Sequence, residues 1–173
     1  MLLYKDQKTA RYAFEELYAR YSTKIYTYCK RILNNDEIAE DVFQETFMKL
    51  YESAKVDRAM TNFSAFVFRI ARNLCINEKH KKYNAFVPLE DFNFPIDDPN
   101  SDSREKLDLL ETAMESLPKK YKEVLVLKEY LGFSYQEIAD LMETTLPSVR
   151  INIYRAKHKL REMLSPYLQD YQK

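Results

Sequence analysis

The chain has 173 residues, a formal net charge of zero and a single glycine, Gly132. Because sheets and their turns normally need more glycine, this composition, rich in helix formers, predicts an all-α protein. A neutral chain has no global attraction to nucleic acid, so any such site must be local. Apolar runs are too short to span a membrane and no signal peptide is evident, so we expect a cytoplasmic protein without membrane insertion. Cys29 and Cys75 are too few for a disulfide scaffold, and we expect buried thiols.

The charge changes along the chain in three steps. Residues 1–82 carry 15 basic and 11 acidic residues, residues 83–106 carry 2 and 6, and residues 107–173 carry 10 and 10. The middle segment also has three prolines and no helical periodicity, which is typical of a linker. We therefore predict two small helical domains, 1–82 and 107–173, joined by the acidic linker 83–106.

Apolar residues at helical spacing predict three long helices in the first domain, over about residues 9–33, 36–54 and 63–82. The outer face of the second of these helices is acidic. It consists of Glu37, Glu40, Asp41, Gln44 and Glu45. Such faces are usually just solvated, so the pattern alone favours a solvated surface over a binding site.

The polar side of the third helix is strongly basic. It contains Arg69, Arg72, Asn73, Asn77, Lys79, Lys81 and Lys82, opposed only by Glu78. Cations next to aromatic rings and amides suit single-stranded nucleic acid, because phosphates meet the cations and bases stack on the rings. The alternative is that the phenylalanines form the core and the cations only keep the surface soluble.

The second domain is predicted to have four helices. The first two begin after Ser101 or Ser103 and at about Pro118, and Gly132 ends the second as a C-terminal cap. Ser134 and Glu137 form a capping-box signature that opens a short helix. After a tight turn, Pro147 suits the first turn of the last helix.

The last two helices have the layout of a helix-turn-helix, in which the second helix lies in the DNA major groove. Its apolar stripe repeats at helical spacing, and no acidic residue occurs between Ser148 and Arg161. Arginine can pair with guanine and asparagine with adenine. A solvated amphipathic helix is the alternative, but the capping box, the turn and the acid-free face together favour DNA binding. The residues predicted to meet DNA are Ser148, Arg150, Ile151, Asn152, Tyr154, Arg155 and Lys159.

The sequence has few of the residue patterns that are typical of an enzyme active site. His80 and His158 are the only histidines, and no cluster of His, Cys and carboxylates has metal-ligand spacing. A single glycine cannot build a glycine-rich phosphate loop. We therefore expect no enzymatic activity, no cofactor and no metal.

Two separate stretches resemble bacterial RNA polymerase sigma factors of the extracytoplasmic-function (ECF) class of the sigma-70 family. AEDVFQETFMKLY (39–51) followed by FSAFVFRIARNLCINEKHKK (63–82) resembles the sigma-2 domain. The stretch from SLPKKYKEVLVL to KLREML (116–164) resembles the sigma-4 domain. Two domains in this order around an acidic linker are far more specific than a helix-turn-helix alone. The resemblance implies a sigma factor that recognises the −35 element and melts the −10 element of promoters.

The resemblance also implies partners and residue roles. Asp41, Gln44 and Glu45 match the motif that docks on the clamp helices of the polymerase β′ subunit, and the β flap is a further expected contact. Asn73 is the best candidate for reading a flipped −10 base. The cations Arg69, Arg72, Lys79, Lys81 and Lys82 would hold phosphates. Arg150, Ile151, Tyr154 and Arg155 match positions that meet the −35 element. ECF-class proteins are commonly held by an anti-sigma factor, so we expect one here.

The chain also departs from the family pattern. It has no tryptophan, and the turn before the last helix lacks the glycine that often stands there. Ile151 and Asn152 replace residues that are often small and polar or basic, so promoter preference does not carry over. The alternative function is a two-domain transcriptional regulator that binds an operator without polymerase.

Overall fold

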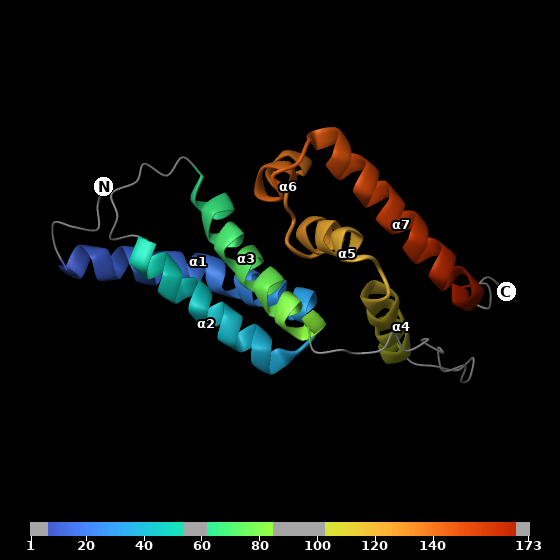
Figure 1. The fold of residues 1–173 in the computed structure, drawn as a ribbon, viewed down its shortest axis with the longest axis horizontal. Helices are drawn as coiled ribbons and strands as arrows, with labels where there is room; N and C mark the ends of the chain where they lie inside the picture. The colour runs from blue at the N-terminus through green and yellow to red at the C-terminus, as the bar shows by residue number, and fades with distance from the viewer. Residues whose placement is uncertain (1–6, 54–61, 85–102, 169–173) are drawn as a thin grey trace.

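The computed structural model describes residues 7–53, 62–84 and 103–168, which are helical apart from short turns (Figure 1). The predicted all-α fold is confirmed. The helices are α1 (Gln7–Leu33), α2 (Asp36–Ser53), α3 (Phe63–Asn84), α4 (Ser103–Glu115), α5 (Lys119–Leu125), α6 (Tyr135–Leu141) and α7 (Leu146–Leu168). None of the helices within these ranges is long and apolar enough to cross a membrane. Residues 85–102, most of the predicted linker, lie outside the described residues.

Helices α1, α2 and α3 form the N-terminal half of the molecule, on the left in Figure 1. Asparagines set two of the helix starts: Asn35 Oδ1 accepts from the amide of Ile38 at 2.8 Å, and Asn62 Oδ1 accepts from the amide of Ala65 at 3.0 Å. Both caps satisfy amides that a helix leaves without a partner in its first turn. Aromatic rings then pack α1 on α2, where the centroids of Tyr18 and Phe47 are 4.7 Å apart.

Helices α4 to α7 form the C-terminal half, in which α7 packs on α4, α5 and α6. Helix α5 continues into a π-helical segment, η1 (Val126–Tyr130), which the sequence did not predict. Gly132 follows with a φ of 74°, a left-handed conformation that glycine adopts without strain, so the predicted C-terminal cap is confirmed.

The helix-turn-helix is also built as predicted. The capping box is present: Ser134 Oγ accepts from the amide of Glu137, whose carboxylate accepts from the amide of Ser134. In the turn, Glu143 has a φ of 52°, and Thr145 Oγ1 accepts from the amide of Ser148 at 3.3 Å. These contacts orient α7 against α6.

Helix α3 buries two faces, which explains how the halves join. The helical spacing of Phe63, Phe66, Val67, Ile70, Ala71 and Leu74 predicts one core stripe, of which Val67 and Ala71 are fully buried. Phe68, which was not expected in the core, is also fully buried, with its ring 4.8 Å from that of Phe133 in the C-terminal half. Phe68, Arg72, Cys75 and Lys79 follow helical spacing and make a second stripe along α3. Part of the basic side of α3 therefore faces the junction between the halves.

Both cysteines are buried, as expected. A hydrogen bond with Cys29 and burial raise the pKa of the Cys75 thiol well above its ordinary value. Buried thiols that solvent does not reach are structural.

Candidate functional site

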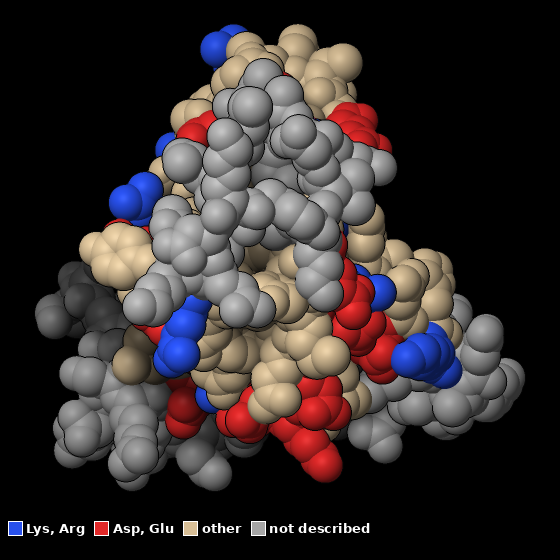
Figure 2. Space-filling model, turned by 90° about the vertical axis from the view of Figure 1, so that its left-hand side faces the viewer, with Lys and Arg blue, Asp and Glu red and all other residues tan. Residues whose placement is uncertain are grey.

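The acidic face of α2 is exposed, as predicted. Asp41, Gln44 and Glu45 all lie on the surface, and Glu45 forms an ion pair with Lys49 at 3.3 Å. The opposite face of α2 is anchored by buried side chains, among them Val42 and Phe47. In Figure 2 carboxylates gather on the lower part of the left-hand face of the molecule, with few cations between them. Helix α2 therefore holds these polar side chains at the surface, with its other face fixed in the core.

The predicted single-strand-binding face of α3 is divided in the structure. Asn73 and Lys81 are exposed, although Lys81 pairs with Glu78 at 2.6 Å. The side chain of Lys82 lies outside the described part of the chain. Arg69, Arg72 and Lys79 are instead half-buried at the junction with the C-terminal half. In this arrangement of the halves, these cations therefore do not all lie on one open surface.

Glu123 of α5 is the centre of the junction. Its Oε1 accepts hydrogen bonds from Arg72 Nε at 2.7 Å and from the Tyr28 hydroxyl at 2.8 Å. The side chain of Glu123 is only 13% exposed, so these charge-assisted bonds are shielded from solvent. Burial, followed by the charge of Glu123, raises the pKa of Tyr28, which keeps its hydroxyl protonated as a donor.

Arg69 reaches the helix-turn-helix itself. Its Nη2 donates to the carbonyl oxygen of Asp140 at 3.0 Å, and its Nε lies 3.7 Å from a carboxylate oxygen of Glu143. That second distance is too long for a hydrogen bond, and the buried Nε has no partner within the described residues. Arg69 and Arg72 thus both donate hydrogen bonds to oxygens of the C-terminal half, Arg69 to a backbone carbonyl and Arg72 to a carboxylate.

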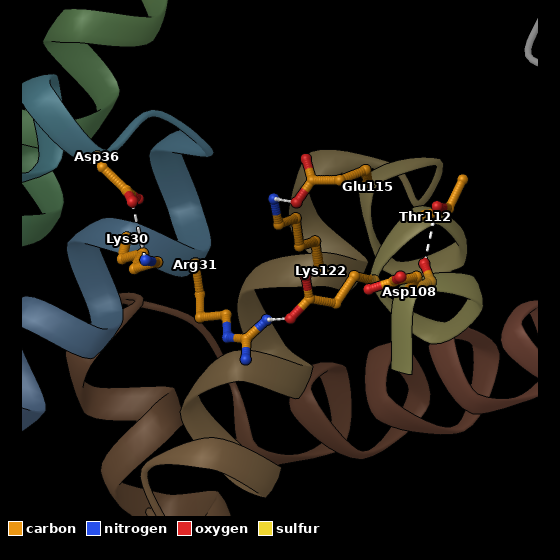
Figure 3. Close-up of polar contacts among 8 residues, drawn as sticks. Lys30, Arg31, Asp36, Asp108, Thr112, Glu115 and Lys122 are labelled. Atoms are coloured by element: carbon orange, nitrogen blue, oxygen red, sulfur yellow. Dashed lines mark hydrogen bonds and ion pairs between the residues drawn. The ribbon is translucent and has the colours of Figure 1, made fainter. Parts of the chain in front are cut away.

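The junction has a further ion pair at its edge. Arg31 of α1, labelled in Figure 3, donates to Glu111 of α4 at 2.6 Å. Its guanidinium lies 4.6 Å from the centre of the Tyr130 ring. Sequence reasoning missed Tyr28, Glu123 and Glu111 as partners, since each contact joins residues at least 51 positions apart. The only sequence feature that could have indicated this junction was the second stripe of α3, which contains Phe68 and Arg72.

The outer face of α7 is open and basic. Its exposed residues include Arg150, Arg155 and Lys159, and Ile151 and Tyr154 are 50% and 70% exposed. Exposed apolar and aromatic side chains between cations are suited to base edges and sugars in a DNA groove. Ser148 is half-buried at the start of α7, where its hydroxyl lies 2.8 Å from that of Thr145.

The structure corrects the prediction for Asn152. Its side chain was predicted to face DNA, but it is 6% exposed, and its Nδ2 has no hydrogen-bond partner among the described residues. The cause is helical spacing: Asn152 lies three positions after Val149 and four before Ala156, on the same face as these two buried residues. Of the apolar residues at helical spacing in this helix, Val149, Ile153 and Ala156 are buried and Leu160 is half-buried.

No group of three or more His, Cys, Asp or Glu that could hold a metal ion occurs in the described ranges. The candidate functional features of the described residues are three surfaces. They are the acidic face of α2, the divided basic face of α3 and the open face of α7.

Comparison with known proteins assigns both halves. The family model for sigma-70 region 2 matches residues 17–84, and that for sigma-70 region 4 matches residues 107–160. The ECF RNA polymerase sigma factor SigE of Mycolicibacterium smegmatis is 30% identical over 90% of this chain, which spans 63% of that relative. SigW of Bacillus subtilis, also an ECF RNA polymerase sigma factor, is 30% identical over 88% of this chain and 89% of its own length.

A solved structure has the same fold. The sigma factor RpoE of Bartonella quintana, in complex with the anti-sigma factor NepR, superposes with a TM-score of 0.72 at 21% identity. The match covers 88% of this chain and 97% of that one.

Proposed function

The chain belongs to the sigma-70 family, in its extracytoplasmic-function class, and from this premise we propose which surfaces carry each step of its function. It is an alternative sigma factor, which directs core RNA polymerase to specific promoters and starts transcription there. The observation that carries this conclusion is the match of two family models in the expected order along one chain. The domain bounds that we propose remain 1–82, 83–106 and 107–173.

We assign polymerase docking to the acidic face of α2. Asp41, Gln44 and Glu45 are exposed side by side on a helix whose other face is fixed in the core. They would meet basic and polar groups of the β′ clamp helices, and the C-terminal half would meet the β flap. The exposure and rigidity of these side chains support the assignment.

Asn73 and the cations of α3 are assigned to the −10 element. Flipping a base costs a few kcal/mol, which contacts to the base and to the phosphates must offset. Asn73 is exposed and can reach a base. Arg69 and Arg72 are bound to oxygens of the C-terminal half, so they can meet phosphates only after the halves separate. A phosphate and the Glu123 carboxylate compete for the same guanidinium of Arg72.

The −35 element is assigned to the outer face of α7. Arg150 and Arg155 are candidates for guanine or phosphate, Lys159 for phosphate, and Ile151 for a thymine methyl or a sugar. Tyr154 and Ser148 complete the surface. Asn152 is not assigned to DNA, because its side chain is buried.

A regulatory partner is also proposed. The solved neighbour RpoE is bound to the anti-sigma factor NepR. We expect that this chain, too, is held by an anti-sigma factor until a signal releases it. We place it in the cytoplasm, because its polymerase partner acts there.

Run-off transcription tests the function. Purified bacterial core polymerase would be assayed with and without the protein on a pooled genomic library from its source. Discrete new starts that share a two-part upstream motif are expected. Failure to produce starts, together with specific duplex binding in the absence of polymerase, would contradict the assignment and favour an operator-binding regulator.

A further inference from the structure

A cavity of about 130 Å³ lies where α1, α3 and α5 meet. Its apolar wall includes Ile32 and Ile76. Its polar lining includes three lysines, Lys79 from α3 and Lys119 and Lys122 from α5, together with His80 from α3. A volume of this size holds about four water molecules at roughly 30 Å³ each, which is enough for one phosphate group.

The carboxylates near this cavity are already engaged. Lys122, only 4% exposed, is bound to Glu115, as Figure 3 shows. Glu123, which also lines the cavity, accepts from Arg72 and Tyr28. Its negative charge is therefore paired with Arg72 of α3, across the junction between the halves. Neither carboxylate is left to neutralise a further cation.

Lys79 is the cation without a counter-ion. It is half-buried, and among the residues that the structure describes it has no hydrogen-bond or ion-pair partner. Burial, followed by the charge of Lys122, lowers the pKa of Lys79, and Glu115 opposes this only in part. A partly buried ammonium next to a second one is unfavourable unless an anion accompanies it.

We propose that this cavity is a binding site for a small tetrahedral oxyanion, a phosphate or the phosphate group of a larger metabolite. Lys79 of α3 and Lys122 of α5 bind its oxygens, and Lys119 and His80 also line the site. Ammonium groups bind phosphate as point charges without needing a fixed fork geometry. The nearby apolar wall limits the site to a compact group.

The ligand would act on the arrangement of the two halves. Lys79 and Lys122 belong to different halves, and their mutual repulsion opposes closure. An anion between them converts this repulsion into attraction and favours the closed arrangement. Any ligand that binds the closed form more tightly than the open form shifts the equilibrium towards closure.

Thermal unfolding of the full chain tests the site, with inorganic phosphate titrated against sodium chloride at equal ionic strength. The melting temperature should rise with phosphate concentration in the wild type. Lys79→Met should abolish this rise, and it should fold well because it removes an uncompensated charge. Lys120→Met is the matched control: this exposed lysine of α5 loses the same charge but does not line the cavity, so it should respond as the wild type does.

NMR titration of the lysine side-chain amines gives a second readout. Phosphate should raise the pKa of Lys79 towards its ordinary value. Titration with adenosine monophosphate distinguishes the two sources of the phosphate group. A stronger response to this nucleotide than to phosphate indicates a nucleotide ligand. No response to the nucleotide indicates the free phosphate ion. Equal stabilisation of the wild type and Lys79→Met, or an unchanged Lys79 pKa with both ligands, would overturn the proposal.

Discussion

Arg72 Nε lies 2.7 Å from Glu123 Oε1, although the two residues are 51 positions apart in the sequence and belong to different halves of the molecule. The same oxygen accepts the Tyr28 hydroxyl at 2.8 Å. The side chains of Arg72 and Glu123 are 22% and 13% exposed, so solvent screens this pair only weakly. The contact both joins the halves and occupies a cation that we assign to promoter DNA.

Glu123→Gln should therefore lower stability by about 1–3 kcal/mol, because it leaves a partly buried arginine without its counter-charge. Urea denaturation followed by circular dichroism measures the change. Glu129→Gln is the control, since Glu129 pairs with Lys157 on the surface and its loss should cost about 0–1 kcal/mol. Equal effects of the two variants would contradict a special role for Glu123.

The capping box of α6 predicts a pH dependence. Hydrogen bonding to Ser134, through its side chain and then its backbone, lowers the pKa of Glu137 below its ordinary value of 4.5. A lowered pKa in the folded state means stability that is present above pH 4.5 and is lost as the pH falls through the folded value. Ser134→Ala should cost about 1 kcal/mol at neutral pH, and less in acid.

Urea denaturation of the wild type and Ser134→Ala from pH 7 down to pH 3 measures this difference. Ser165→Ala serves as control, because that hydroxyl only donates to the carbonyl of Glu162 within α7. A difference between wild type and Ser134→Ala that stays constant with pH would disprove the linkage to Glu137.

Asn152 should be dispensable for −35 recognition. Asn152→Leu fills a similar volume and removes a buried amide nitrogen that lacks a partner, so stability should be unchanged or rise by about 1 kcal/mol. Affinity for −35 DNA, measured with the polymerase holoenzyme, should not change. A loss of about 1–3 kcal/mol specific to one adenine would instead show that Asn152 reads that base.

Arg155 is exposed on the same helix and should behave in the opposite way. Arg155→Ala should weaken −35 binding by about 1–3 kcal/mol at one base pair and leave the unfolding free energy nearly unchanged. Holoenzyme binding to a set of single-base promoter variants measures it. A uniform loss across the set would mean a phosphate contact. Arg11→Ala, an exposed arginine of α1, controls for the loss of one positive charge.

Asp41 is the test of polymerase docking. Asp41→Ala should weaken binding to core polymerase by about 1 kcal/mol or more, as expected for a central polar contact, without changing the circular dichroism spectrum. Fluorescence anisotropy of labelled protein titrated with core enzyme measures this. Glu52→Ala removes the same charge from the far end of α2 and should bind like the wild type. Unchanged affinity of Asp41→Ala would remove this face from the docking surface.

The sequence by itself determined the features that depend on local geometry. Helical periodicity, the single glycine and the capping box specified an all-α fold, the cap at Gly132 and the helix-turn-helix, since each follows from neighbours a few residues apart. The exposure of Asp41 and Arg155 followed from the same periodicity. The resemblance of two stretches to one family supplied the function.

The tertiary structure alone decided how the halves meet. Periodicity shows which residues share a face but not what covers that face, so the basic side of α3 was read as open. In the structure Phe133 and Glu123 cover part of it, which buries Phe68 and pairs Arg72. On α7, helical spacing places Asn152 at the edge of the buried stripe, three positions after Val149 and four before Ala156. Only the packed structure showed that its polar side chain is buried there. Contacts between distant residues and the exact edge of a buried stripe both depend on tertiary packing. Local sequence patterns do not specify that packing.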